Sequence, residues 1–197
     1  MSPFTLVSLL LLALLVFWAV GAYNRLIRLK NAIATAFPPM DVQLKRRDAL
    51  LGRLVDLTQQ TPQLGAPALD GISSARHLTR HASEAVLARP VDPVAVDALS
   101  TAEQALVTPL GDLVAAWQAH PDAAAAEPFR AMREDLLSTD HTLAFARQTY
   151  NDAADEYNQA KAQFPTVVLA RLFAFAPAAA FKNHKAETEC LAESEPT

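Results

Sequence analysis

The feature that most constrains this chain is an uncharged apolar run close to its amino terminus. No Asp, Glu, Lys or Arg occurs from Phe4 to Ala22. An α-helix rises about 1.5 Å per residue, so this run would extend roughly 28 Å, close to the thickness of the hydrocarbon core of a bilayer. Trp18 and Tyr23 lie near its carboxyl-terminal end, where aromatic side chains gather at membrane surfaces. The sequence therefore predicts a single transmembrane anchor here.

A cleaved signal peptide is the alternative interpretation of the same run. Val20 and Ala22 are small enough to stand at a cleavage site. However, no Lys or Arg precedes the run, and the run is longer than the apolar core of a usual signal peptide. These two observations favour a permanent anchor.

Basic residues lie after the apolar run rather than before it. Arg25, Arg28 and Lys30 follow it directly. The positive-inside rule then predicts that the short amino terminus lies outside and that the rest of the chain is cytoplasmic. The same three side chains are candidates for contacts with anionic lipid headgroups, each worth about 1 kcal/mol.

The rest of the chain has the composition of a helical protein. Hydrophobic residues make up 51% of the sequence, aromatic residues only 7%, and there are only five glycines. Alanine and leucine, which are good helix formers, account for the surplus. The net charge of −4 provides no basic footprint for nucleic acid. The single cysteine excludes an intramolecular disulfide and a cysteine-rich metal site.

Apolar periodicity predicts four helical segments and no strand. They are expected at residues 23–36 with 40–60, 67–89, 94–119 and 128–164. Pro38 and Pro39 should kink or restart the first segment, and Pro109 should kink the third. Pro62 and Pro121 mark turns, and short connections favour antiparallel neighbours. The expected fold class is therefore all-α: a long up-down-up-down four-helix bundle continuous with the transmembrane helix.

The inner faces of these segments follow from the spacing of apolar residues. In the second segment the face is Leu69, Ile72, Ala75, Leu78, Ala82 and Val86. In the third it is Leu99, Leu106, Leu110, Leu113 and Trp117. In the fourth, a coiled-coil-like seam repeats every seven residues at Phe129, Leu136, Leu143, Tyr150, Tyr157 and Phe164. A second row of mainly small residues lies three positions later, at Met132, Thr139, Ala146, Ala153 and Ala160.

The first and fourth segments are longer than the two between them. Their lower halves, residues 24–36 and 150–163, must then pair without help from the middle helices. The apolar stretch at residues 165–181 is the remaining candidate to cover them. We therefore expect this stretch to fold back onto the bundle close to the bilayer. The alternative is a free amphipathic docking peptide.

Several stretches of the chain resemble the LemA family. They are YNRLIRLKNAIATAF at 23–37, DVQLKRR at 41–47, ARQTYNDAADEYNQAKAQFP at 146–165 and ARLFAF at 170–175. The paired Tyr-Asn motifs together with DVQLKRR are the specific part of this resemblance, whereas LLGRLV at 50–55 departs from the family pattern. The resemblance implies a divergent member: a membrane-anchored antiparallel helical bundle of bacteria, without an established biochemical activity.

The expected domain layout follows from the anchor, the segments and this resemblance. A tail of residues 1–3 precedes the anchor at 4–22, a LemA-like bundle spans 23–181, and an acidic, disordered tail spans 182–197. The resemblance places the anchor in the bacterial inner membrane.

Charged and polar residues on or near the predicted seams are candidates for structural or interaction roles. Asp41, Arg76, Asp140 and Arg147 are expected to form interhelical ion pairs that fix which helices meet. Arg47 is a further candidate for a structural or interaction role. An acid–base pair for catalysis is the alternative, but no nucleophile, metal cluster or glycine loop accompanies it.

Asparagines gather at the end of the bundle nearest the membrane. Asn24 and Asn31 are seven residues apart, as are Asn151 and Asn158, which directly follow Tyr150 and Tyr157. In the antiparallel arrangement the two asparagine pairs should face each other and set the register by hydrogen bonding across helices. Ligand binding at this end is the alternative.

His77, His81 and Glu84 share one face of the second segment at a spacing that could hold zinc. They lie roughly opposite the apolar stripe, so a solvated helix face is the favoured interpretation. No metal or other cofactor is expected.

The expected function is a non-enzymatic, membrane-anchored helical scaffold or adaptor of the bacterial cell envelope. It would present a bundle surface to another membrane or envelope protein or to the membrane. The alternative is a small-molecule or lipid sensor with a membrane-proximal cleft between the long first and fourth helices. An exposed apolar stripe on a filled bundle would favour the first, and a pocket with converging polar groups the second. No nucleic-acid partner is expected, and a homo-oligomer is left open.

Overall fold

The computed structural model describes residues 3–60, 66–120 and 126–182, and within these ranges it contains helices and no strand. The helices are α1 (Pro3–Gln59), α2 (Ala66–Ala88), α3 (Pro93–Gln104), α4 (Val107–Ala119), α6 (Glu127–Ala162) and α7 (Thr166–Leu172). The turns expected at Pro62 and Pro121 lie outside the described residues, as does the acidic tail beyond Lys182. The expected all-α class is confirmed.

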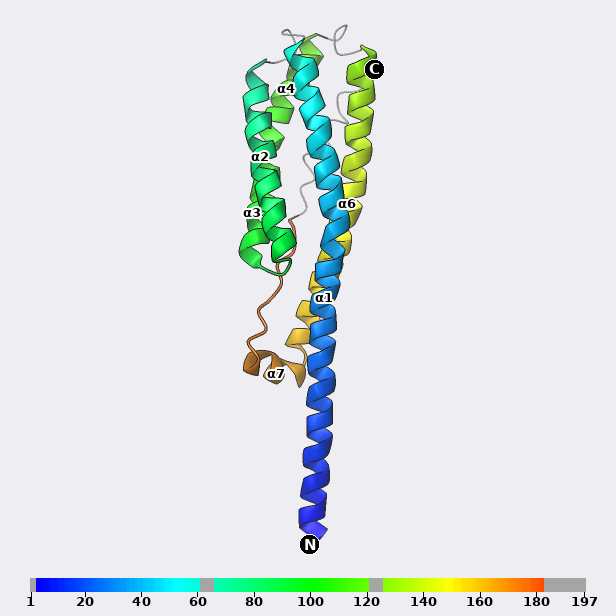
Figure 1. Cartoon of the computed structure of the whole chain (residues 1–197), viewed down its shortest axis with the longest axis vertical. Coiled ribbons are helices and arrows are strands. Elements are labelled where there is room, and N and C mark those ends of the chain that lie inside the picture. The colour runs from blue at the N-terminus through cyan, green and yellow to red at the C-terminus, as the bar shows by residue number, and fades with distance from the viewer. Residues whose placement is uncertain (1–2, 61–65, 121–125, 183–197) are drawn as a thin grey trace.

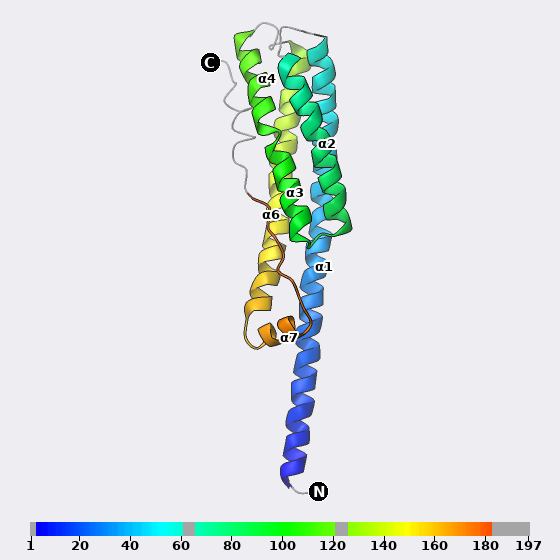
Figure 2. The ribbon, with the colours of Figure 1, turned by 90° about the vertical axis from the view of Figure 1, so that its left-hand side faces the viewer.

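The two longest helices, α1 and α6, lie side by side (Figure 1). The chain runs up α1, back along α2, up again through α3 and α4, and down α6 (Figure 2). The helices α2, α3 and α4 accompany only the part of this pair that is far from the amino terminus. Below them, α7 and the chain that follows it lie against α1 and α6.

The amino-terminal part of α1 extends beyond the rest of the domain (Figure 1). This helix is long and apolar enough to cross a membrane, judged by length and composition. Its large apolar side chains from Phe4 to Val20 are exposed, and its first buried side chain is Leu26. The same helix therefore carries an uncovered apolar segment and, further on, a large share of the core.

The kink or restart expected at Pro38 and Pro39 is wrong, because α1 continues through both prolines. Proline leaves the carbonyl four residues earlier without its amide donor. Both rings are exposed, so those carbonyls lie on the outer side of the helix, where water can replace the donor. Phe37 and Met40 on either side are fully buried, and their packing holds the helix together across the prolines.

The expectation of a single, kinked third helix is also wrong, because α3 ends at Gln104 and a separate helix, α4, begins at Val107. The break lies around the carbonyl of Ala105, four residues before Pro109, which is the carbonyl that a proline ring displaces. Gly71 lets Pro109 approach α2 closely, since a Cβ at Gly71 would lie 2.9 Å from Cβ of Pro109.

The predicted inner faces are buried with three exceptions. Leu78 is exposed, and Thr79, whose hydroxyl donates to the carbonyl of Ala75, takes the inner position. Phe164 is exposed because α6 ends at Ala162, two residues before it. Ala154 is buried where the seam pattern places Ala153, which is half-buried.

The core consists of two apolar clusters, one above the other along α1 and α6. The cluster far from the amino terminus includes Leu51, Leu54 and Trp117. The cluster nearer to the apolar segment includes Leu26, Tyr150 and Phe181. Buried charged residues separate the two clusters, and they are described below.

The seam predicts that truncating Leu143 strongly lowers the stability of the fold. Leu143 is 2% exposed and belongs to the lower cluster, which is the one nearer to the apolar segment of α1. Leu143→Ala should lower the free energy of unfolding by about 2–5 kcal/mol, because it removes buried methyl groups and leaves a cavity. Denaturant unfolding of the detergent-solubilised chain, followed by circular dichroism, measures this.

Phe145→Ala is the matched control, since Phe145 lies on the same helix and is 75% exposed. It should change the free energy of unfolding by less than about 0.5 kcal/mol. Equal losses in both variants would mean that the seam is misassigned.

Candidate functional site at the end of the bundle nearest the apolar segment

The two Tyr-Asn motifs of α6 hold the chain segment that follows α7. We call this segment, residues 173–182, the strap. The strap runs along α6 in the opposite direction to the helix (Figure 2). It covers the part of the α1–α6 pair that α2 and α3 do not reach (Figures 1 and 2).

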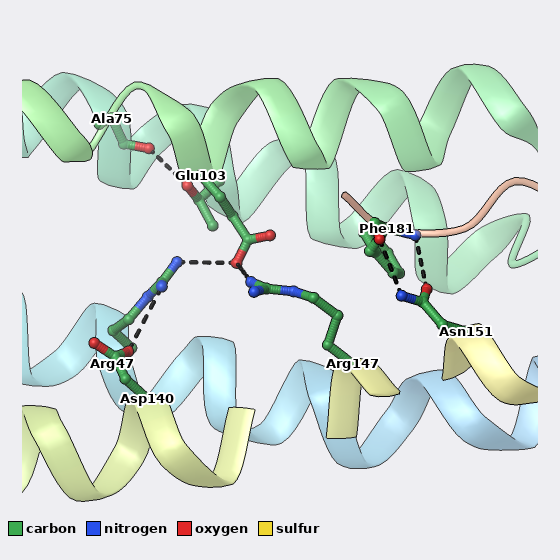
Figure 3. Close-up of polar contacts among 8 residues, drawn as sticks. Arg47, Ala75, Glu103, Asp140, Arg147, Asn151 and Phe181 are labelled. Carbon is green, nitrogen blue, oxygen red and sulfur yellow. Dashed lines mark hydrogen bonds and ion pairs between the residues drawn. The ribbon is translucent and has the colours of Figure 1, made fainter. Parts of the chain in front are cut away.

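Each asparagine of these motifs binds one strap residue through both of its backbone groups. Asn158 Nδ2 donates to the carbonyl of Ala178 at 2.8 Å, and Asn158 Oδ1 accepts from the Ala178 amide at 3.0 Å. Asn151 does the same with Phe181 at 3.0 and 2.8 Å (Figure 3). A carboxamide presents a donor and an acceptor side by side, as a neighbouring strand would, so the contact depends on the strap backbone.

The spacing of these contacts matches in the two partners. Asn151 and Asn158 are seven positions apart on a helix, while Ala178 and Phe181 are three positions apart on the strap. Seven helical residues rise about 10.5 Å, and three extended residues span about 10 Å. The seven-residue repeat of the motif is therefore the repeat at which an extended chain meets one face of a helix.

The tyrosines of the same motifs donate to backbone carbonyls. Tyr157 binds the carbonyl of Ala176 at 2.8 Å, and Tyr150 binds that of Pro90, in the α2–α3 connection, at 2.6 Å. Burial raises the pKa of Tyr150 to about 12 and also raises the pKa of Tyr157. Both hydroxyls therefore stay protonated and able to donate at neutral pH.

Aromatic side chains fill the space between the strap and the helices. The ring of Phe181 lies 4.7 Å from that of Tyr150 and 6.3 Å from that of Phe37, measured between centroids. At the other end of the strap, Phe173 and Phe175 pack edge-on against Tyr23 at 5.1 and 5.7 Å. The structure therefore places residues 166–182 back on the bundle, as the uncovered apolar side of the long helices predicts.

The expected bonding between the asparagines of α1 and α6 is wrong. Asn24 and Asn31 are exposed, because Leu26 and Ile33 occupy the inner face of α1 two positions further on. The described bonds of Asn151 and Asn158 go to the strap instead. Sequence periodicity along α6 could place these two residues near an inner face, but it could not identify a backbone as their partner.

The basic residues that follow the apolar run are on the surface. Arg25, Arg28 and Lys30 are all exposed on α1. Lys30 also lines a cleft of about 690 Å³ between α1, the α2–α3 connection and the strap. Arg89, Tyr157 and Phe175 are among the other lining residues, so the cleft combines cationic groups with aromatic walls.

A buried group of four charges lies between the two apolar clusters. Figure 3 shows its members, Arg47, Glu103, Asp140 and Arg147. Glu103 Oε1 accepts from Arg147 at 2.8 Å and from Arg47 at 3.1 Å. Arg47 also lies 3.6 Å from Asp140. Two cations face two carboxylates, and together they join α1, α3 and α6. Removing one partner of such a buried group leaves an uncompensated charge, which costs about 3–5 kcal/mol.

Glu103 was not among the residues expected here, although its spacing carried a signal. It continues the apolar face of α3 between Leu99 and Leu106, so a helix built from this pattern turns its carboxylate inward. Arg147 follows Leu143 in the same way on α6. A charge at a core position of a helix indicates an opposite charge on a neighbouring helix.

The carboxylates of the polar groups have shifted pKa values. Burial raises the pKa of Asp140, and the attraction of Arg47 offsets this only in part. Burial also acts to raise the pKa of Asp48, but the hydrogen bonds from Arg80 and Arg76 outweigh it, so the pKa is lowered. Asp48 joins α1 to α2 through these arginines at 2.7 and 2.8 Å.

The remaining candidates are Asp41 and the group formed by His77, His81 and Glu84. Asp41 pairs with Lys45 on its own helix, and its contact with α2 is a hydrogen bond from Ser83 at 2.6 Å rather than an interhelical ion pair. His77, His81 and Glu84 are exposed on α2. Among the described residues, no group of three or more His, Cys, Asp or Glu side chains is placed to hold a metal ion.

The described residues define an all-helical protein with one helix long and apolar enough to cross a membrane, and with a strap held by two Tyr-Asn motifs. The sequence model of the LemA family matches residues 36–192, which is most of the chain and includes both motifs. The chain belongs to the LemA family. A search of curated proteins found no match.

Removing one of the two asparagine side chains should release the strap locally from α6. Asn158→Ala deletes two hydrogen bonds to Ala178, each with a net value of about 0.5–1.5 kcal/mol, so exchange of the Ala178 amide should accelerate by about fivefold or more. Hydrogen exchange of the full chain, resolved to residues 176–182, measures this.

Asn24→Ala is the control, because it removes the same side chain from an exposed position of α1. Its exchange pattern over the strap should equal that of the unaltered chain. If Asn158→Ala also left the Ala178 amide unchanged, the side-chain contact would not hold the strap.

The raised pKa of Asp140 predicts the sign of its effect on stability. The Asp140 carboxyl binds its proton more tightly in the folded state than in the unfolded state, where its pKa is near 3.8. As the pH falls from neutral through the raised pKa toward 3.8, the unaltered chain should gain stability relative to Asp140→Asn, with no further change below.

Carbon NMR of the Asp140 carboxyl gives the titration midpoint directly. A midpoint above 3.8 is expected, and a midpoint at or below it would mean that the arginines outweigh burial.

Proposed function

We propose that this chain is a non-enzymatic, membrane-anchored helical scaffold of the bacterial cell envelope. It presents the surface of its bundle to a partner protein or to the membrane. The observation that carries this proposal is the continuity of α1, which spans Pro3–Gln59 without a break. A continuous helix transmits the orientation of its apolar segment to the domain, whereas a flexible linker would not.

We infer that the domain is one rigid up-down bundle with four helix positions, and that α3 and α4 together fill the third position. Two features support this: the apolar clusters extend over all these helices, and buried charges join α1, α3 and α6. A rigid unit of this kind suits a role in holding a partner at a fixed distance from the membrane.

A lipid or small-molecule sensor is the second candidate, and the cleft beside the strap is the observation in its favour. Lys30 and Arg89 supply cationic groups there, and Phe175 supplies an apolar wall. Arg89 also pairs with Asp92 at 2.8 Å, which lowers its availability to an anion. A stoichiometric lipid or metabolite retained by the purified chain would favour this function over the scaffold.

The proposed orientation places the domain in the cytoplasm, because basic residues follow the apolar segment and none precedes it. Protease added to intact spheroplasts should leave the domain uncut and should cut it after lysis. Cleavage of the domain in intact spheroplasts would reverse the orientation.

In the same cells, a photo-crosslinking residue at exposed Phe145 should give a discrete adduct with an envelope or membrane protein. The matched control is the same residue at buried Leu136, which should give none. An absence of adducts from Phe145 and from other exposed positions of the bundle would contradict the scaffold.

A further inference from the structure

Exposed apolar side chains gather on α7 and at Phe164 and Phe173, which lie just before and just after this helix. Phe164 is 85% exposed, Val168 58%, Leu172 74% and Phe173 54%. Elsewhere in the described domain beyond α1's apolar segment, large exposed apolar residues such as Leu78 stand apart from one another along their helices. Single exposed apolar residues are ordinary, whereas a cluster marks a surface that something covers.

The apolar cluster lies on the side of α7 that faces away from the bundle. Thr166, Leu169 and Ala170 are buried, and they occupy the opposite side of the helix from Val168 and Leu172. Residues four apart share a helix face, so Val168 and Leu172 form one face. The short helix therefore holds the bundle with one side and leaves an apolar side outward.

This outward side lies at the level where α1 leaves the domain. The ring of Phe173, at the end of α7, packs against Tyr23 at 5.1 Å, and Tyr23 directly follows the apolar run of α1. Both views show α7 and the turn before it at the end of the domain from which α1 runs on toward the amino terminus (Figures 1 and 2). If α1 crosses a bilayer, the bilayer surface meets this end.

The charges at this level suit an anionic surface. Arg25 and Arg28 are exposed on α1 just beyond the apolar run, and Arg171 is exposed on α7. Lys161, at the end of α6, is half-buried. Aromatic and aliphatic side chains ringed by Arg and Lys are the composition of helices that lie in the headgroup region of a membrane.

We propose that α7 is a second membrane contact, in which Phe164, Val168 and Leu172 enter the headgroup region of the bilayer that α1 crosses. This inference rests on the proposed membrane anchor. The strap ties α7 to α6, so the contact fixes the tilt of the bundle relative to the membrane. A single spanning helix by itself leaves that tilt free.

The test uses the full chain with its one cysteine removed (Cys190→Ser), one chain per nanodisc of phosphatidylcholine and phosphatidylglycerol. An environment-sensitive fluorophore is attached at Val168→Cys or Leu172→Cys. Leu78→Cys is the matched control, because Leu78 is an exposed apolar residue on α2, and Leu12→Cys reports on the anchor. Nitroxide-labelled phospholipid then quenches labels that lie within the bilayer.

Labels on α7 should emit at shorter wavelength and be quenched severalfold more strongly by nitroxide lipid than the label at Leu78. If they were quenched no more than the Leu78 label while the Leu12 label was quenched, the anchor would stand and this inference would be overturned. An unquenched Leu12 label would overturn both. Labels on α7 that are shielded from aqueous iodide but not quenched by nitroxide lipid would mean that protein covers the face, which also contradicts the proposal.

Discussion

The helices α1 and α6 are longer than the helices that pack against them, and another segment has to cover the part left over. An uncovered pair of helices would leave Leu26, Ile33 and Tyr150 in water, although all three are fully buried. The strap supplies the missing side. Its residues 176–182 belong to no helix or strand, so their backbone groups can be buried only where side chains satisfy them. Asn151 and Asn158 do this, and their spacing lets one helix face serve two points of the strap.

The buried charges between the two apolar clusters have a different role, which is to fix which helices meet. Apolar seams alone permit helices to slide or exchange neighbours, because leucine packs about equally well against any leucine. Glu103, placed between Arg47 and Arg147, can pair with both arginines in one arrangement of α1, α3 and α6. The cost of burying these charges is offset only when all are paired, which ties the two apolar clusters to one register.

The helical class, the seam of α6 and the return of the chain after α6 could be predicted from periodicity and helix length. Three local features could not. Helix propensity at Pro38 argues for a break, but the packing of Phe37 and Met40 overrides it. Asn24 and Asn31 match the α6 asparagines in spacing, yet a two-residue offset from Leu26 and Ile33 turns them to solvent. The backbone partners of Asn151 and Asn158 carry no sequence signature, since any residue offers the same amide and carbonyl.

The strap is a fixed part of the bundle in this structure, and one distance tests this most directly. Spin labels are placed at exposed Ala180 on the strap and at exposed Glu156 on α6. Pulsed electron paramagnetic resonance of the full chain with Cys190→Ser, in nanodiscs, then measures the distance between the two labels. A strap held by Asn151 and Asn158 predicts a single short distance with a narrow distribution, which broadens when both asparagines are changed to alanine. A broad distribution in the unaltered chain would contradict the account, because the lower halves of α1 and α6 would then have no fixed cover.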